Sequence, residues 1–309
     1  MIIVCPHCRK KHDIDEKRIP ANVTMARCKG CGNRFPLQEA IEKPASPAPS
    51  AGGGQERRAR IIGVTLSKGG VGKTTTAVNL ATGLALAGFE VLLIDTDTQG
   101  QASFCLGVHP KAGLTELVTE ELSAAEAVVK ARERLDLLAG GKSLAGLKRI
   151  IDRKDFGGEL TLAESIRPLE GRYDYIIVDT SPGWDPLTIN VLFMVREVLV
   201  PVSLEVMSVQ GLVEFLKSLA SIQKYRKELE LKYILPTFRD RRVKNADVIL
   251  EKLHEVYGDM VCEAIRYNVR LSEAPALGQT IYEFAPGSNG AQDYRELVRK
   301  VADNPKLFR

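Results

Sequence analysis

The 309-residue sequence lacks any run of ~18 apolar residues, which excludes a membrane-spanning helix. It also lacks an N-terminal basic segment followed by a long apolar stretch, so we expect no secretory signal, and it contains no internal repeat. These absences favour a cytoplasmic protein in a reducing compartment, where the six cysteines would not form structural disulfides. Hydrophobic residues at 44% and charged residues at 27% are typical of a globular protein and exclude disorder, collagen and a disulfide scaffold.

Net charge is scarce as well, and the small excess lies at one end of the chain. The formal charge is +4. Residues 1–43 hold nine Lys/Arg and five Asp/Glu, whereas residues 44–309 hold 34 of each sign. Because a partner meets the local charge and not the sum, the position of the excess matters more than its size.

Two Cys-x-x-Cys pairs predict a zinc ribbon in residues 1–43. Cys5 and Cys8 form the first pair and Cys28 and Cys31 the second, with 19 residues between the pairs. Four-cysteine zinc sites use a spacing of about 15–20 residues, and two such turns complete a tetrahedron of thiolates. A segment of this size buries too little apolar surface to fold unaided, so the metal would supply the folding energy. A redox dithiol is the alternative, but no thioredoxin-like βαβ pattern surrounds either pair.

The partner of this ribbon stays open. Zn²⁺ held by four thiolates would reduce the formal +4 of residues 1–43 to about +2. A charge of this size is small for a nucleic-acid-binding surface, and docking to a protein is an equal alternative. We expect His7 and His12 to be solvated, and Cys105 and Cys262, which stand alone, to be small buried apolar side chains. Residues 1–37 resemble the short zinc ribbons at the N-termini of some bacterial proteins.

A linker separates this ribbon from a larger domain. Residues 44–60 include the run PASPAPSAGGG, which has no large apolar side chain, and end in the basic residues Arg57, Arg58 and Arg60. Residues 61–309 form the second domain.

In residues 61–309, short apolar runs alternate with amphipathic helical stretches. The runs lack polar alternation, as strands covered on both faces do, and they are Ile61–Leu66, Val91–Ile94, Tyr175–Val178 and Val198–Val202. Helical spacing recurs in two later sets of apolar residues, Leu212, Phe215, Leu216, Leu219 and Ile222, and Ile249, Leu250, Leu253 and Val256. We therefore expect an α/β domain with a mostly parallel sheet flanked by helices.

A glycine-rich loop follows the first predicted strand. Residues 67–75 read SKGGVGKTT and precede a helical stretch. Glycines let backbone N–H groups surround phosphates, Lys73 would reach the β- and γ-phosphates of ATP, and the Thr74 hydroxyl would bind Mg²⁺. Ser67 replaces the first glycine of the strict P-loop pattern, and the loop carries an additional lysine, Lys68. A simple turn is the alternative, which the strand before and the helix after the loop disfavour.

Three aspartates follow predicted strands. Asp95 and Asp97 come after Val91–Ile94, and Asp179 comes after Tyr175–Val178. Ligands bind at the carboxyl ends of parallel strands, where one carboxylate can hold the shell of Mg²⁺ and another can orient a water. A single aspartate there is often only a helix cap, but three beside a P-loop indicate a hydrolytic site.

These motifs together resemble the deviant Walker A ATPases of the ParA/MinD superfamily. Residues 68–75 (KGGVGKTT) and 91–100 (VLLIDTDTQG) are similar to its Walker A and following motifs, and residues 173–182 (YDYIIVDTSP) to its Walker B segment. Residues 186–190 (PLTIN), 268–275 (NVRLSEAP) and 290–292 (GAQ) fit the ParA branch. The resemblance covers residues 61–303, and it departs from the family pattern at Thr98 and at Arg266-Tyr267.

The resemblance implies a P-loop NTPase in which two subunits enclose two ATP molecules. Lys68 would reach the phosphates of the partner subunit, and Asp97 would position the lytic water. Thr74 and Asp179 would serve the magnesium ion, and Asp95 would support the site. Other nucleotide contacts are implied for Gly69, Gly70, Val71, Gly72, Lys73 and Thr75 in the loop, and for Thr237 and Arg266 near the adenine.

The ParA branch also implies non-specific DNA binding and an activating partner. The matching cations here are Arg239, Arg241, Arg242, Lys244 and Arg270. A solvated loop is the alternative for this charge run, and phosphate contact would be steeply salt-dependent. A ParB-like protein would stimulate hydrolysis by a nucleoid-associated homodimer.

Three other outputs remain open at this stage. A MinD-like ATPase would grip a membrane through a C-terminal helix, but the stripe of Tyr294, Leu297, Val298 and Val301 could equally pack on the domain, and Asn304-Pro305 ends it. A metal-carrier role would need bridging cysteines, which Cys105 and Cys262 do not match. A nucleotide-switched adaptor would use the ribbon as its docking module.

Overall fold

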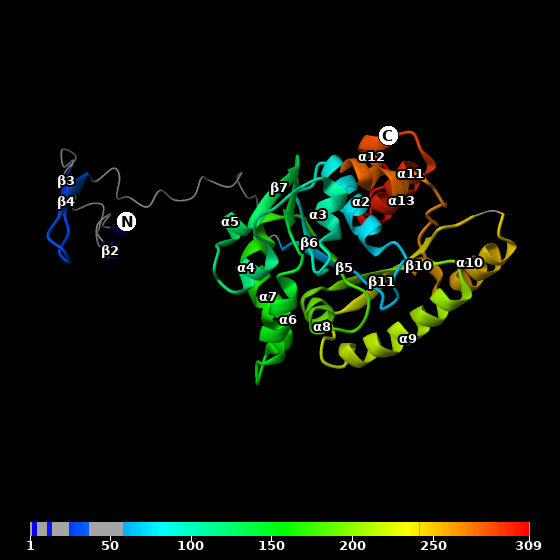
Figure 1. The fold of residues 1–309 in the computed structure, drawn as a ribbon, viewed down its shortest axis with the longest axis horizontal. Helices are drawn as coiled ribbons and strands as arrows, with labels where there is room; N and C mark the ends of the chain where they lie inside the picture. The colour runs from blue at the N-terminus through cyan, green and yellow to red at the C-terminus, as the bar shows by residue number, and fades with distance from the viewer. Residues whose placement is uncertain (1, 5–10, 14–24, 37–57, 241, 309) are drawn as a thin grey trace. The chain divides into compact units, whose positions relative to one another are not determined.

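The computed structural model describes residues 2–4, 11–13, 25–36, 58–240 and 242–308, and the chain divides into two compact units, Met1–Gln55 and Glu56–Arg309 (Figure 1). In the first unit, β1 (Ile2–Val4) pairs antiparallel with β2 (Lys11–Asp13), and β3 (Met25–Arg27) pairs antiparallel with β4 (Arg34–Pro36). Residues 44–57 of the predicted linker lie outside the described residues.

A seven-stranded sheet forms the centre of the second unit. Its order is β11-β10-β5-β9-β6-β8-β7, and every neighbouring pair is parallel except β7 with β8. The strands are β5 (Arg60–Val64), β6 (Val91–Asp95), β7 (Val128–Arg132), β8 (Leu135–Leu138), β9 (Tyr175–Asp179), β10 (Glu197–Ser203) and β11 (Glu230–Thr237). The prediction of a mostly parallel sheet is confirmed, and the four predicted strands correspond to β5, β6, β9 and β10.

Helices cover both faces of the sheet, as Figure 1 shows. On one face lie α4 (Leu114–Val118), α6 (Leu144–Asp152), α7 (Thr161–Ile166), α8 (Pro186–Met194), α9 (Val206–Gln223) and α10 (Lys244–Tyr257). On the other lie α2 (Lys73–Leu86), α3 (Gln101–Leu106), α12 (Ile281–Phe284) and α13 (Asn289–Val301). Shorter elements are α5 (Ala124–Ala127), α11 (Arg270–Glu273) and the 3₁₀ helices η2 (Gly158–Leu160), η3 (Arg167–Arg172), η4 (Gly258–Met260) and η5 (Ala274–Leu277).

Alternation along each strand divides the core into two layers. In β5, Ile61 packs with the α6–α9 layer and Ile62 with the α2–α13 layer, and both side chains are buried. Successive side chains of a strand point to opposite faces, so a strand between two helical layers must be apolar throughout. This is why the predicted runs showed no polar alternation.

The C-terminal helix α13 uses its apolar stripe inside the molecule. Tyr294, Leu297, Val298 and Val301 are each at most 2% exposed and belong to the α2 layer. The packing alternative for this stripe is therefore the one that the structure adopts. In the described part of the chain, no helix combines the length and the apolar character that a membrane crossing needs.

Two glycines bring distant segments into backbone contact. Gly107 ends α3 with φ 64°, and Gly278 ends η5 with φ 64°. A Cβ atom added to Gly278 would lie 2.6 Å from the Cα of Gly107. Real Cβ atoms do not approach backbone so closely, so these positions require glycine both for conformation and for space.

Candidate nucleotide-binding site

The glycine-rich loop lies at the carboxyl end of β5 and leads directly into α2. Gly70 and Gly72 adopt positive φ values of 73° and 88°, which curl the chain before the helix begins at Lys73. Within the described residues, the N–H groups of residues 69–75 donate no hydrogen bond to another backbone group. A row of unsatisfied amides at a helix N-terminus fits a polyphosphate, which would accept from them.

The two loop lysines have different surroundings. Lys73 is 6% exposed, and its Nζ donates to the carbonyl oxygen of Lys68 at 2.8 Å. Burial lowers the pKa of Lys73, while the charges of Asp179 and Asp97 oppose that shift. The Nζ of Lys68 instead donates to the Oγ of Ser208 on α9 at 3.0 Å. The pair of carboxylates beside Lys73 places this lysine at the centre of the site, whereas Lys68 is held at its margin.

Asp95 and Asp179 face each other across adjacent strands. They are directly paired in the register of β6 and β9, and both are 0% exposed. Asp95 accepts hydrogen bonds from the N–H of Asp97 at 2.8 Å and from the N–H of Ala102 at 3.1 Å. Burial, which these hydrogen bonds partly offset, raises the pKa of Asp95 to about 7. Asp95 is therefore tied into the backbone of the loop that carries Asp97.

Asp179 has a different environment. Burial and the neighbouring charge of Asp95 raise its pKa well above the usual range, and the Thr74 hydroxyl and Lys73 act in the opposite direction. Neither carboxylate oxygen has a hydrogen-bond partner with good geometry among the described residues. An orphaned buried carboxylate beside a hydroxyl is costly unless a cation or donor completes it, so Thr74 and Asp179 fit a magnesium site.

Asp97 lies in the loop between β6 and α3 and is partly exposed. Its Oδ1 accepts from the N–H of Gln99 at 2.9 Å, and its carbonyl oxygen accepts from Gly100 and Gly141 at 3.1 and 3.0 Å. This network fixes the backbone and leaves Oδ2 without a hydrogen bond to any described residue, while the charge of Asp97 acts on Lys73. The arrangement can orient a water molecule near the phosphates.

The two residues expected near adenine make other contacts in this structure. Thr237 is buried, and its hydroxyl donates to the carbonyl oxygen of Val71 at 3.0 Å, so it supports the loop from beneath. The guanidinium of Arg266 binds both carboxylate oxygens of Asp293 on α13, with the shortest contact at 2.6 Å. Adenine contacts for both residues stay a prediction.

The cations expected to bind DNA each have an acidic neighbour where the structure describes their contacts. Arg239 contacts Asp247 at 2.9 Å, Arg242 contacts Asp240 at 2.6 Å, and Arg270 contacts Glu273 at 2.9 Å; the side chain of Arg242 is 82% exposed. Arg242 lowers the pKa of Asp240 to about 2. Arg241 lies outside the described residues, and Lys244 begins α10.

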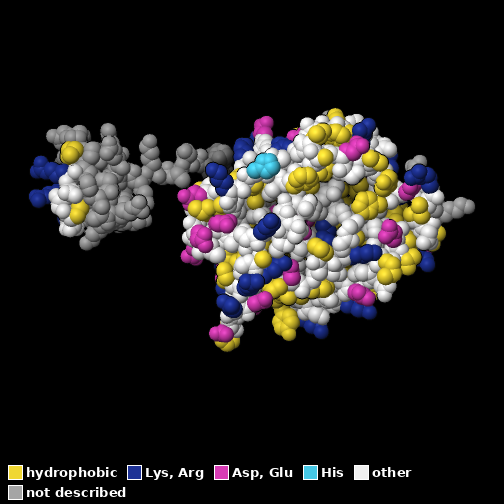
Figure 2. Space-filling view, in the orientation of Figure 1, with side chains coloured by type: hydrophobic (Ala, Val, Ile, Leu, Met, Phe, Trp, Pro, Cys, Tyr) yellow, Lys and Arg dark blue, Asp and Glu magenta, His cyan; other side chains and the backbone are white. Residues whose placement is uncertain are grey.

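Charge is mixed over the wider surface too. In Figure 2, Lys/Arg and Asp/Glu side chains are interspersed on the visible face of the second unit. Exposed ion pairs contribute little in water, so a phosphate can displace the carboxylate from such an arginine.

In the first unit, the second Cys-x-x-Cys pair forms a turn between β3 and β4. Cys28 is 3% exposed, its Sγ accepts from the N–H of Gly30 at 3.2 Å, and Gly32 adopts φ 76°. Gly30, in the same turn, does not use positive φ. Cys5 and Cys8 lie outside the described residues, so the four-thiolate set stays a prediction.

Sequence reasoning missed the groups that hold the loop in place. Ser208, which accepts from Lys68, also makes a short contact with Ser203 at the end of β10, and both are buried. Nothing in a local motif marks these serines, because they reach the loop only when β10 lies beside β5 in the sheet. The position of Ser203 at the carboxyl end of a predicted strand was the one available signal.

Comparison with known proteins agrees with this geometry. A family model described as an AAA domain matches residues 59–232, and one described as a zinc-ribbon domain matches residues 1–36. The chain is 36% identical to the sporulation initiation inhibitor protein Soj of Bacillus subtilis, over 79% of this chain and 99% of that protein. It is 37% identical to the chromosome-partitioning ATPase Soj of Thermus thermophilus, over 79% of this chain and 96% of that protein. The structure of an ATP complex of a Cyanothece McdA variant superposes with a TM-score of 0.72 at 22% identity, over 82% of this chain and 99% of that one.

Proposed function

Because the chain belongs to the ParA/Soj family of the ParA/MinD superfamily and is a ParA-type ATPase with an N-terminal zinc-ribbon domain, we propose that it is a positioning ATPase that works on DNA. It dimerises on binding ATP and Mg²⁺, binds DNA without sequence preference, and hydrolyses ATP slowly until a ParB-like partner stimulates it. The cargo is a chromosome, a plasmid or a protein assembly, and the protein acts in the cytoplasm on the nucleoid.

The orphaned carboxylate of Asp179 is the observation that carries the nucleotide part of this proposal. The amides of residues 69–75 would hold the phosphates, Lys73 would pair with their charge, and Thr74 with Asp179 would hold Mg²⁺. The metal would neutralise charge on the phosphates. Asp97 would orient the attacking water, and Asp95 would keep the Asp97 backbone in place through its hydrogen bond.

Apolar surface next to Lys68 supports dimerisation. Val206 and Met207, which begin α9 beside Ser208, are 64% and 65% exposed, and Trp184 after β9 is 39% exposed. Exposed apolar groups clustered around a functional lysine are typical of an interface with another protein surface. A second copy docked here would cover them and bring Lys68 to the opposite nucleotide.

The test of the dimer uses Lys68→Ala, with Lys130→Ala as the matched control because Lys130 is exposed on the edge strand β7. Lys68→Ala should retain ATP binding but lose ATP-dependent dimerisation or hydrolysis, while the control behaves as wild type. Sedimentation velocity and phosphate release measure both. Wild-type dimerisation and turnover in Lys68→Ala would refute the proposal.

DNA binding is tested at the most exposed candidate arginine. Arg242→Ala should weaken ATP-dependent binding to random duplex and reduce the steepness of its salt dependence by about one counterion. Arg149→Ala, an exposed arginine on α6, is the control. Equal affinity of Arg242→Ala and wild type across a salt titration would exclude this residue from the DNA contact.

The zinc-ribbon match favours one alternative, a nucleotide-switched adaptor that docks its partner through residues 1–36. In that case partner binding depends on nucleotide state but not on turnover. Asp97→Ala, which should abolish hydrolysis but not ATP binding, separates the two. In this variant an adaptor still binds and releases its partner as the nucleotide changes, whereas the cycle of an ATPase stops. Zinc in the ribbon is tested by metal analysis of the wild type against Cys28→Ser.

A further inference from the structure

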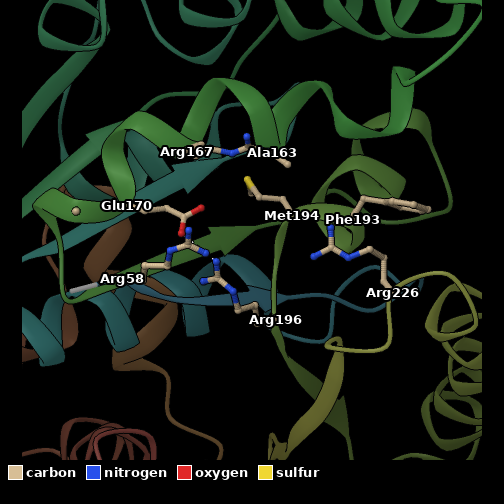
Figure 3. Close-up of a pocket in the computed structure, with 9 residues that line it drawn as sticks. Arg58, Ala163, Arg167, Glu170, Phe193, Met194, Arg196 and Arg226 are labelled. Atoms are coloured by element: carbon tan, nitrogen blue, oxygen red, sulfur yellow. Dashed lines mark hydrogen bonds and ion pairs between the residues drawn. The ribbon is translucent and has the colours of Figure 1, made fainter. Parts of the chain in front are cut away.

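A cavity of about 730 Å³ lies in the second unit, away from the nucleotide site. Four arginines line it, Arg58, Arg167, Arg196 and Arg226, together with a single acidic side chain, Glu170. Figure 3 shows these side chains converging from different parts of the chain, with the guanidinium groups of Arg58 and Arg196 next to Glu170 and that of Arg226 directed into the cavity. Contributions from four separate segments make this a feature of the fold and not of one charge run.

The acidic groups nearby do not balance the arginines. Arg196 binds Glu170 at 2.9 Å, and Arg226 contacts Glu228 at 3.1 Å. The side chains of Arg58 and Arg167 form no hydrogen bond or ion pair with any described residue, and both residues are exposed and line the cavity. Like charges gathered in a concave surface raise the local potential and attract an anion.

One donor is also left without an acceptor. The Nε–H of Arg226 is buried and has no hydrogen-bond partner among the described residues. This Nε–H is closed to solvent, so a ligand would contact Arg226 through the part of its side chain that remains accessible, which is 20% exposed. The excess positive charge gathered in this concave lining indicates an oxyanion.

The rest of the lining is apolar. Phe193 and Met194, at the end of α8, and Ala163, on α7, complete the wall. A concave site with apolar walls and several guanidinium forks suits a compact ligand, since pockets for small molecules have volumes of ~300–1,000 Å³. Guanidinium groups bind phosphate oxygens in bidentate geometry, and their number here matches a ligand with more than one phosphate.

We propose that this cavity binds a small polyphosphate-bearing anion, at a second site distinct from the P-loop. Three of the four arginines lie at the amino ends of parallel strands: Arg58 precedes β5, Arg196 precedes β10 and Arg226 precedes β11. The P-loop follows the carboxyl end of β5, so five residues of strand, roughly 17 Å, separate the two sites. Both sites can therefore be occupied at once.

The test uses inorganic tripolyphosphate as the probe, measured by titration calorimetry on the full chain at low salt. Lys73→Ala removes the main cation of the P-loop, so binding that remains in this variant reports the second site. We expect Lys73→Ala to retain a salt-sensitive binding event that the additional change Arg167→Ala weakens by about tenfold, the effect of one lost charge-assisted contact. Adding Arg149→Ala instead should change nothing.

Three results would overturn the proposal. The first is loss of all tripolyphosphate binding in Lys73→Ala. The second is equal tripolyphosphate binding by Lys73→Ala with and without Arg167→Ala. The third is that duplex DNA binds to Lys73→Ala but tripolyphosphate does not. Because Arg167 is exposed and has no ion-pair partner among the described residues, its substitution leaves no buried partner behind, and circular dichroism checks that the variant is folded. These outcomes do not depend on dimerisation or DNA binding, so the proposed function and this site can fail separately.

Discussion

Ser208 should restrain dimerisation by holding Lys68 within its own subunit. In the structure, the Nζ of Lys68 donates to the Oγ of Ser208 at 3.0 Å, and Ser208 is 0% exposed. A lysine that reaches the partner's nucleotide must first give up this contact. Removing the acceptor with Ser208→Ala would make Lys68 available at no cost, so we expect tighter ATP-dependent dimers.

The size of the effect follows from the contact. A hydrogen bond to a charged group contributes about 1.5–3 kcal/mol, and partial exposure of Lys68 reduces this to about 1 kcal/mol in each subunit. A dimer releases two such contacts, or about 2 kcal/mol, which corresponds to about 30-fold in its dissociation constant. Equilibrium sedimentation with a slowly hydrolysed ATP analogue measures this constant.

Two comparisons isolate the contact. Ser221→Ala changes an exposed serine of the same helix α9 and should leave the dimer unchanged. In a Lys68→Ala background, Ser208→Ala should have no further effect, because the pair no longer exists. A Ser208→Ala dimer that is as weak as wild type, or weaker, would contradict this restraint, provided that urea unfolding shows the variant to be folded.

Three further predictions test other parts of the structure. Asp179→Asn should raise the melting temperature of the nucleotide-free protein by several degrees, since it removes a carboxyl group whose ionisation burial and Asp95 disfavour, yet abolish Mg²⁺-dependent ATP binding; a lower melting temperature would contradict the orphaned carboxylate. Gly278→Ala should cost about 2–4 kcal/mol in the free energy of unfolding, whereas Gly157→Ala, at a similar φ of 70° but in open space, should cost only about 1–2 kcal/mol; equal urea midpoints would dismiss the backbone contact. Burial raises the pKa of Cys262 to about 12, so at pH 8 the folded protein should hold less thiolate there than the unfolded chain, and native iodoacetamide labelling followed by mass spectrometry should find Cys262 unmodified.

Local pattern was enough to predict the centre of the sheet and the loop on it. The four predicted strands lie next to helices on both faces, so their sequences are apolar throughout, and Asp95 and Asp179 mark the ends of two of them. The β7–β8 hairpin was not predicted: Lys130 faces solvent on its edge strand, and the pattern there is mixed.

Contacts between distant segments could not be read from motifs. The Thr237 hydroxyl donates to the carbonyl oxygen of Val71, and Arg266 is bound to Asp293, because the tertiary fold brings β11 to the loop and α13 to Arg266. Each of these pairs is more than 25 residues apart in sequence, and no spacing rule links them. The arginines around Glu170 could not be predicted from a motif either, since only the tertiary fold brings them together.

The contact of Gly107 with Gly278 joins two distant segments through their backbones alone. Gly107 ends the helix that starts just after the Asp97 loop, and Gly278 lies eight residues beyond Arg270. Because backbone lies against backbone here, a shift of one segment would displace the other, so the contact joins the helix that follows the Asp97 loop to the segment that follows Arg270. No side chain takes part in this contact, so alanine substitutions at the neighbouring residues would not affect it. Only a substitution of Gly107 or Gly278 would disrupt it.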